Sequence, residues 1–169
     1  MDVADYERVR KDYGYCASWA VWANSDGRPK SNIGDLTVFD ERTFPILNIV
    51  KPEFILVGLN LSGDIDGSPP FSNFHSMKSS AQDYKLRHAL QNTPLWGAYL
   101  TDAIENFPEL SSSKVVLHLK QNPDLAKENI ASLKREIGEI GGPEPVVFAL
   151  GRAAYELLTE YLGRKLRIV

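Results

Sequence analysis

Polar side chains follow apolar stretches of this chain at three places, and each place brings groups that can do chemistry. The first is Asn60, which follows the apolar run Phe54–Leu59. An amide oxygen can orient a water molecule by accepting a hydrogen bond, although an amide is a poor general base. Ligands of open α/β sheets bind where strands end in such loops. We therefore expect Asn60 to be catalytic, with Gly58 and Ser62 beside it in ligand binding.

The second place is the aromatic segment Phe71–His75. Phe71 and Phe74 could stack on an aromatic ligand, or they could anchor a long loop in the core. His75 could donate a hydrogen bond, bind phosphate or act as an acid, and it is as often a structural hydrogen-bonding residue. Asn73 lies between the two aromatic residues and is a further candidate for ligand binding.

The third place is Thr101–Asp102, which follows a short expected strand at Ala98–Leu100. A carboxylate at a strand end could accept a hydrogen bond from an amino group of a ligand, whereas a carbonyl would be repelled by Asp102. The alternatives for Asp102 are a helix N-cap or a salt bridge to Lys85 or Arg87.

Few other residues invite a chemical role. Cys16 is the only cysteine, so one chain can form neither a disulfide nor a cysteine-ligated cluster. Its apolar surroundings predict a buried, structural thiol. No set of His, Asp and Glu residues has the spacing of metal ligands, and we expect neither a metal nor a cofactor. Asp64 and Asp66 could supply a carboxylate near Asn60.

Composition sets the broad class. The chain has 169 residues, 43% of them apolar and 24% charged, which is ordinary for a soluble protein. Its formal net charge of −3 argues against strong non-specific binding to nucleic acid. The acidic N-terminus does not resemble a secretory signal, and no apolar run approaches the ~20 residues of a membrane span. We expect a cytoplasmic protein without a membrane partner, monomeric by default.

The elements that would position these residues alternate between strands and helices. We expect strands at Phe54–Leu59, Ala98–Leu100, Val146–Leu150 and Leu166–Val169, with another within Tyr15–Trp22. Helices are expected at Asp5–Lys11, Phe39–Val50, Ser80–Gln91, Asn122–Ile140 and Ala153–Leu162, and a loop followed by a weak strand or linker at Ser111–Leu117. This alternation predicts an α/β fold, a three-layer α/β/α sandwich with a short, mostly parallel central sheet. One domain over residues 1–169 is expected, continuing past Val169 because the chain stops inside a strand pattern.

The order of these segments resembles the uracil-DNA glycosylase superfamily. Gly58-Leu59-Asn60-Leu61-Ser62 is similar to the Asn-bearing, mismatch-specific form of its first motif. Thr101-Asp102 followed by Phe107-Pro108 resembles a later Thr-Asn motif with a downstream proline. Val146–Leu158 is similar to the strand–glycine–helix before the last motif, and the resemblance covers roughly Phe54 to Val169.

The chain also departs from the pattern of that family. Leu61 stands where the family has proline after the catalytic amide, and Asp102 stands where it has a base-reading Asn. The final His-Pro-Ser motif would come just after Val169, and the four cysteines of the iron–sulfur branches are lacking.

The resemblance implies a nucleobase, nucleotide or nucleic-acid ligand and a hydrolase of DNA repair that cleaves N-glycosidic bonds. Asn60 would position the water that attacks the sugar C1′, and Phe71 or Phe74 would stack on the flipped base. Two alternatives stay open on the same fold: a non-catalytic binding or interaction module, and a hydrolase of a free modified nucleoside.

Overall fold

The structure is a computed structural model of the chain, and it describes every residue except 41, 43–44, 63–66, 79–80 and 164–166. Several expectations lie outside the described residues, namely those on Phe44, Gly63, Asp64, Asp66, Ser80 and Leu166.

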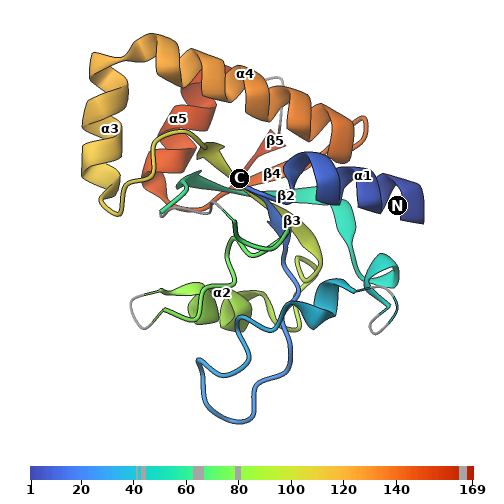
Figure 1. The fold of residues 1–169 in the computed structure, drawn as a ribbon. Coiled ribbons are helices and arrows are strands. Elements are labelled where there is room, and N and C mark those ends of the chain that lie inside the picture. The colour runs from blue at the N-terminus through green and yellow to red at the C-terminus, as the bar shows by residue number, and fades with distance from the viewer. Residues whose placement is uncertain (41, 43–44, 63–66, 79–80, 164–166) are drawn as a thin grey trace. The chain divides into compact units, whose positions relative to one another are not determined.

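A five-stranded, mostly parallel mixed sheet confirms the α/β class (Figure 1). Its strands, in the order β1-β3-β2-β4-β5, are β1 (Ser18–Trp19), β2 (Lys51–Asn60), β3 (Ala98–Ile104), β4 (Val146–Ala149) and β5 (Arg167–Ile168). β2 and β4 pair in parallel from Phe54↔Val146 to Val57↔Ala149, and β4 pairs in parallel with β5. The expected strands therefore share one sheet, while the three-layer arrangement stays a prediction.

The apolar run in β2 explains why it forms an inner strand. Ile55, Leu56 and Val57 are at most 1% exposed, although successive side chains of a strand point to opposite faces. Burial on both faces is typical of strands in parallel sheets and accounts for the lack of alternation in this segment.

By its internal contacts the chain divides into two compact units. Unit 1 comprises Met1–Lys51 and Asp66–Tyr99, and unit 2 comprises Pro52–Ile65 and Leu100–Val169. The single domain over residues 1–169 stays a prediction.

Unit 1 contains two α-helices, α1 (Val3–Tyr13) and α2 (Asp83–Leu90), and two short 3-10 turns, η1 (Leu36–Phe39) and η2 (Ile46–Asn48). The side chain of Asp2 caps α1 by accepting a 2.8 Å hydrogen bond from the Asp5 amide. Aromatic rings fill much of the core of this unit: Tyr6, Trp19, Phe39, Phe71 and Tyr99. Cys16 is fully buried there, as expected.

Unit 2 contains α3 (Ser112–Gln121), α4 (Pro123–Ile140) and α5 (Arg152–Leu162). Figure 1 shows the sharp bend between α3 and α4, where Pro123 begins the second helix. Proline suits a first helical position, because its missing N–H would have no partner inside the helix. α4 and α5 confirm the expected helices, and Leu133, Ile137 and Leu158 are among their buried residues.

Two expected elements are wrong. α3 replaces the expected loop and weak strand, because Val115 and Leu119 are spaced to share one buried face of a helix. The expected helix at Phe39–Val50 is absent from the described residues of that range. Asp40 follows η1 and pairs with Arg42 at 2.8 Å.

Among the helices that the structure describes, none combines the length and apolar character needed to cross a bilayer.

Candidate functional site

The carboxyl ends of β2 and β3 meet at one edge of the sheet in unit 2. Leu61, directly after β2, donates a 3.2 Å backbone hydrogen bond to Ile104, the last residue of β3. Both strands therefore deliver their following loops to the same place, as the strand-end argument requires.

Asn60 stands at this edge with its side-chain amide fixed. Its Nδ2 donates to the carbonyl oxygens of Leu61 at 2.8 Å, Glu109 at 2.9 Å and Phe107 at 3.2 Å. Three acceptors would repel an amide oxygen, so this network also fixes which atom is nitrogen. Oδ1 thus points away from them, and within the described part of the chain it has no hydrogen-bond partner. The side chain can hold a water molecule or a ligand donor in one direction.

The loop that receives Asn60 is tied down at its other end by Asn129 of α4. The Asn129 Oδ1 accepts from the Glu105 amide at 3.0 Å, and its Nδ2 donates to Asn106 Oδ1 at 2.9 Å. Glu109 accepts from the amide of Ser111, and this bond, with a weaker contribution from Lys114, lowers the pKa of the Glu109 carboxyl. These hydrogen bonds fix the loop of residues 105–111 beside Asn60.

Thr101 and Asp102 lie inside β3, because the strand continues through Ala103 and Ile104. This corrects the expectation that Asp102 stands at the strand end; it lies two residues before it. Both residues are buried, at 0% and 4% exposure. Among the residues that the structure describes, the Thr101 hydroxyl is a buried polar group with no hydrogen-bond partner.

The segment around Asn73, in unit 1, is held by hydrogen bonds in an uncommon backbone conformation. Phe71 and Phe74 have φ angles of 65° and 64°, which few non-glycine residues adopt. The Ser18 hydroxyl donates to the Phe71 carbonyl at 2.8 Å, and the Trp22 indole donates to the Phe74 carbonyl at 3.1 Å. The Asn73 side chain donates a hydrogen bond to the Cys16 carbonyl and accepts one from the Phe74 amide. These bonds offset the strain of the two positive φ angles.

The two phenylalanines differ in what they can contact. Phe71 is fully buried, with its ring centroid 5.6 Å from that of Tyr6 and 5.4 Å from that of Phe39. It cannot stack on a ligand without leaving the core. Phe74 is half-buried and keeps part of its surface accessible.

His75 is 4% exposed and lies between aromatic rings, 5.2 Å from Trp22 and 5.0 Å from Phe39 between ring centroids. Burial lowers its pKa to about 4, and the nearby carbonyls of Ile33 and Trp19 offset only part of that fall. The ring is neutral at physiological pH. Its Nδ1 lies 3.3 Å from the Ile33 carbonyl, whereas the buried Nε2 meets no partner with hydrogen-bond geometry. This environment fits packing better than acid catalysis.

The candidate residues are divided between the units. Unit 2 holds buried Gly58, Asn60, exposed Ser62, Thr101 and Asp102. Unit 1 holds Phe71, Asn73, Phe74 and His75. Within unit 2 the structure brings together the ends of β2 and β3, with Asn60 at the end of β2 and Asp102 two residues before the end of β3.

Sequence reasoning missed the supporting role of Asn129 and the setting of Arg87. Arg87 of α2 is 5% exposed and donates to the carbonyls of Pro29, Ser31 and Ala23 at 2.7, 2.8 and 3.0 Å. The apolar pattern of α4 predicts which face of the helix is buried. It does not predict that a polar residue on that face, Asn129, holds the loop after β3.

No three His, Cys, Asp or Glu residues gather as cation ligands in the residues that the structure describes. Comparison with known proteins yields no matching family model, curated protein or solved structure.

Proposed function

We propose that the carboxyl ends of β2 and β3 bind a nucleobase or nucleotide, and that Asn60 positions water for hydrolysis of an N-glycosidic bond. The observation that carries the proposal is the Asn60 amide. Its nitrogen is fixed by three carbonyls, so its oxygen is presented in one direction at a strand edge. A pre-set acceptor of this kind reduces the entropy cost of orienting an attacking water.

The reaction needs little from the protein beyond positioning. The water oxygen bonds to the sugar C1′, the bond from C1′ to the base nitrogen breaks, and one water proton ends on the departing base. Positive charge develops on the sugar and negative charge on the base. Asn60 accepts a hydrogen bond from the water without removing its proton, because an amide is a poor base. We therefore expect slow hydrolysis.

One polar group of β3 supports a preference for a base with an amino group. The Asp102 carboxylate is acceptor-only when ionised, so it favours an exocyclic amine over a carbonyl. The Thr101 side chain points to the opposite face of β3, because successive side chains of a strand alternate, so it does not act beside Asp102. Phe71 takes no part in stacking in this proposal, since its ring belongs to the core of unit 1. His75 takes no chemical step, because its burial keeps it neutral.

Two other functions fit the same fold. The net charge of −3 favours a free modified nucleoside over duplex DNA as substrate, because phosphate neutralisation dominates DNA affinity. A non-catalytic binding module would keep the base contact of Asp102 and would show no turnover.

A substrate panel tests the proposal. The protein is incubated with single-stranded and mismatched duplex oligonucleotides that carry uracil, hypoxanthine or xanthine, none of which has an exocyclic amino group. It is also incubated with free nucleosides including adenosine and cytidine, whose bases do have one. Release of the free base is measured. Cleavage of substrates whose base carries an amino group supports the proposal, and cleavage of uracil alone refutes the role of Asp102. Binding without turnover identifies the binding module, and absence of both overturns a nucleobase site.

A matched pair of variants separates the chemistry of Asn60 from its support of the loop. Asn60→Ala removes both the amide oxygen and the bonds to Phe107 and Glu109. Asn129→Ala loosens the same loop at Glu105 and leaves the Asn60 side chain in place. A much larger fall in kcat for Asn60→Ala assigns water positioning to Asn60. Equal falls would show that it acts only through the loop.

A further inference from the structure

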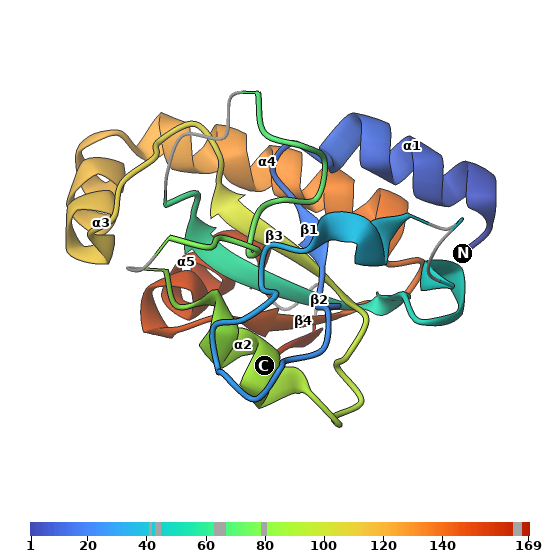
Figure 2. The ribbon, with the colours of Figure 1, turned by 60° about the horizontal axis from the view of Figure 1, so that its bottom comes forward.

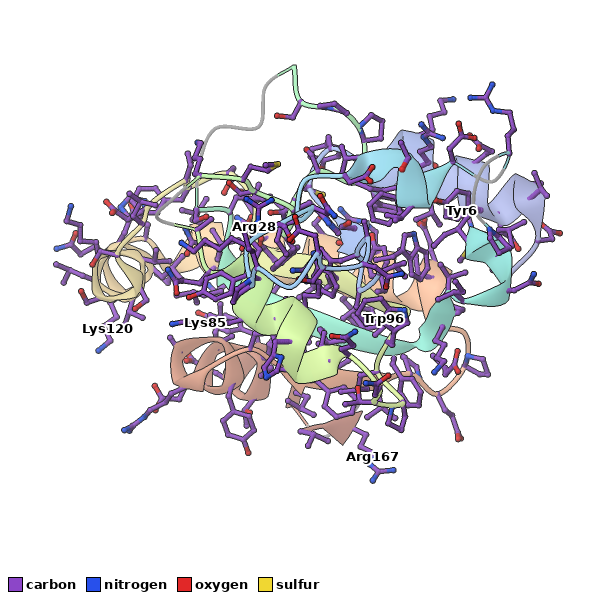
Figure 3. The ribbon with its side chains drawn as sticks, turned by 90° about the horizontal axis from the view of Figure 1, so that it is seen from below. Tyr6, Arg28, Lys85, Trp96, Lys120 and Arg167 are labelled. Atoms are coloured by element: carbon purple, nitrogen blue, oxygen red, sulfur yellow. The ribbon has the colours of Figure 1, made fainter. Side chains whose placement is uncertain are left out.

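A pocket of about 480 Å³ opens in unit 1 between α2 and the loop that precedes η1. Helix residues Tyr84, Arg87, His88 and Gln91 recur at the spacing of one helical face, and Lys85 flanks them. The opposite wall comes from Ser25, Gly27 and Pro29. Figure 2 shows this loop running beside α2, and Figure 3 shows Lys85 on the helix and Arg28 on the loop. The site described above uses none of these residues.

The lining of this pocket is cationic. Lys85 and Arg87 contribute two positive charges, and no Asp or Glu belongs to the lining. The nearest acidic residue of the loop, Asp26, pairs with Arg28, and this bond holds the pKa of Asp26 well below its usual range. Asp26 is therefore paired mainly with Arg28, although its charge also acts on Arg87. A protein with a net charge of −3 thus keeps a pocket of the opposite sign.

Arg87 makes the strongest case for an anionic occupant. Its guanidinium is buried and contacts three neutral carbonyls, and no described carboxylate forms a salt bridge with it. Desolvation lowers its pKa, which measures the cost of burying this charge. The charge of Asp26 acts on Arg87 and offsets part of this cost, but the direct contacts of the guanidinium are neutral carbonyls. Guanidinium groups bind phosphate oxygens with charge-assisted hydrogen bonds.

The remaining walls suit a phosphate attached to an organic group. The ring of Tyr84 offers an aromatic surface, and the Lys30 ammonium lies 5.0 Å from its centroid, which brings a third cation to this side of the helix. Gln91 and His88 add polar groups at the end of α2. A volume of about 480 Å³ exceeds what one phosphate fills.

We propose that the pocket between α2 and residues 25–29 binds the phosphate of a nucleotide or of a nucleic-acid backbone, with Arg87 and Lys85 as its cationic contacts. The proposal is independent of the N-glycosidic chemistry proposed for Asn60, since it concerns different residues in unit 1. Either source of phosphate presents the same oxygens to the guanidinium.

Titration calorimetry at low ionic strength tests the proposal with three probes: inorganic phosphate, a nucleoside 5′-monophosphate and a short single-stranded oligonucleotide. We expect all three to bind. Tighter binding of the monophosphate than of the oligonucleotide identifies a free nucleotide as the source. Tighter, strongly salt-dependent binding of the oligonucleotide identifies the backbone. No binding of any probe up to about 10 mM overturns the proposal.

A pair of lysine variants locates the binding. Lys85→Gln removes one exposed charge from the rim, and we expect roughly threefold to tenfold weaker phosphate binding, as loss of one partly screened charge predicts. Lys134→Gln removes an equally exposed charge from α4 and should leave the affinity unchanged. Equal effects of the two variants would mean general charge attraction and would overturn the site. Because Lys85 makes no described salt bridge, its replacement leaves the fold intact.

Discussion

The amide nitrogen of Asn60 lies 2.9 Å from the carbonyl oxygen of Glu109, so the last residue of β2 holds the loop that follows β3. One side chain thereby performs two tasks, since its nitrogen organises the loop and its oxygen is left for a ligand. Changes at Asn60 must therefore be measured on stability as well as on binding and turnover.

Asn60→Asp should destabilise the protein more than Asn60→Ala. The carboxylate puts an oxygen in front of the carbonyls of Leu61, Phe107 and Glu109, where it accepts nothing and is repelled. Alanine leaves the same carbonyls short of a donor, at a cost of about 1–3 kcal/mol. Urea denaturation of both variants at pH 7 checks the order. A more stable Asp variant would contradict the assignment of Nδ2 to the carbonyl side.

Phe71→Ala should lower stability strongly, whereas Phe74→Ala should lower it much less. Phe71 is fully buried among aromatic rings, and truncating such a residue typically costs about 3–5 kcal/mol. Phe74 is half-buried, so its truncation should cost less than about half as much. Thermal denaturation compares the two variants. Similar melting temperatures would show that the Phe71 ring does not carry the core of unit 1.

His75 should make stability fall as the pH drops from 6.5 to 4. In the unfolded chain His75 takes up a proton below its ordinary pKa of 6.5, whereas burial lowers the pKa of the folded residue to about 4. The unfolded state binds more protons across this window, so the free energy of unfolding decreases with falling pH. The contribution of His75, fully present above pH 6.5, diminishes by about 3 kcal/mol when pH 4 is reached.

His75→Phe provides the control for that pH dependence. Phenylalanine keeps an aromatic ring between Trp22 and Phe39 and cannot be protonated. Asp83 works in the opposite direction, because burial raises the pKa of its carboxyl and favours its protonated form on folding. Both proteins contain Asp83, so the difference between their urea midpoints across pH 4–6.5 isolates His75. Parallel curves would contradict the prediction.

Gly97→Ala should destabilise the protein, and Gly138→Ala should not. Gly97 has a φ of 92°, and a Cβ there would collide with the carbonyl of Ile49. We expect a loss above about 2 kcal/mol from strain and steric clash together. Gly138 lies inside α4 with open space around it, where alanine gains roughly 0.5–1 kcal/mol. Denaturation midpoints that move in the same direction would refute this contrast.

The apolar strands and the strong helices could be predicted from sequence, for a physical reason. The central residues of β2 are apolar on both faces of the strand. An unbroken apolar run of this length therefore predicts a strand that is buried on both faces. α4 combines a first-turn proline at Pro123 with apolar residues on one face, and two independent signals agree.

The failures come from segments in which tertiary packing decides. Val115-Val116-Leu117 has β-branched residues that favour a strand locally, yet burial of Val115 and Leu119 on one face stabilises a helix. β3 continues to Ile104 because its residues are buried throughout, which moved Asp102 from the expected strand end to the interior. Burial on both sides depends on neighbours that a single sequence does not reveal.

The candidate site shows the same division. Asn60 could be predicted as a site residue because it ends an apolar run. The hydrogen bonds that fix its side chain could not be predicted, since their acceptors are the carbonyls of Phe107 and Glu109, far along the chain. The burial of Arg87 against three loop carbonyls also could not be predicted from the neighbouring sequence, because arginine on a short helix usually faces solvent.

The pairing of β2 with β4 has a consequence for how the chain is made. β2 leaves the ribosome well before its partner, since Phe54 pairs with Val146, and translation of the intervening segment takes roughly 5–20 s. During that interval the apolar β2 segment has an unpaired hydrogen-bonding edge on the side of β4. Unpaired edges of this kind promote self-association of nascent chains. Folding of unit 2 is thus tied to completion of β4, and truncation before Val146 should yield an insoluble product rather than a smaller folded protein.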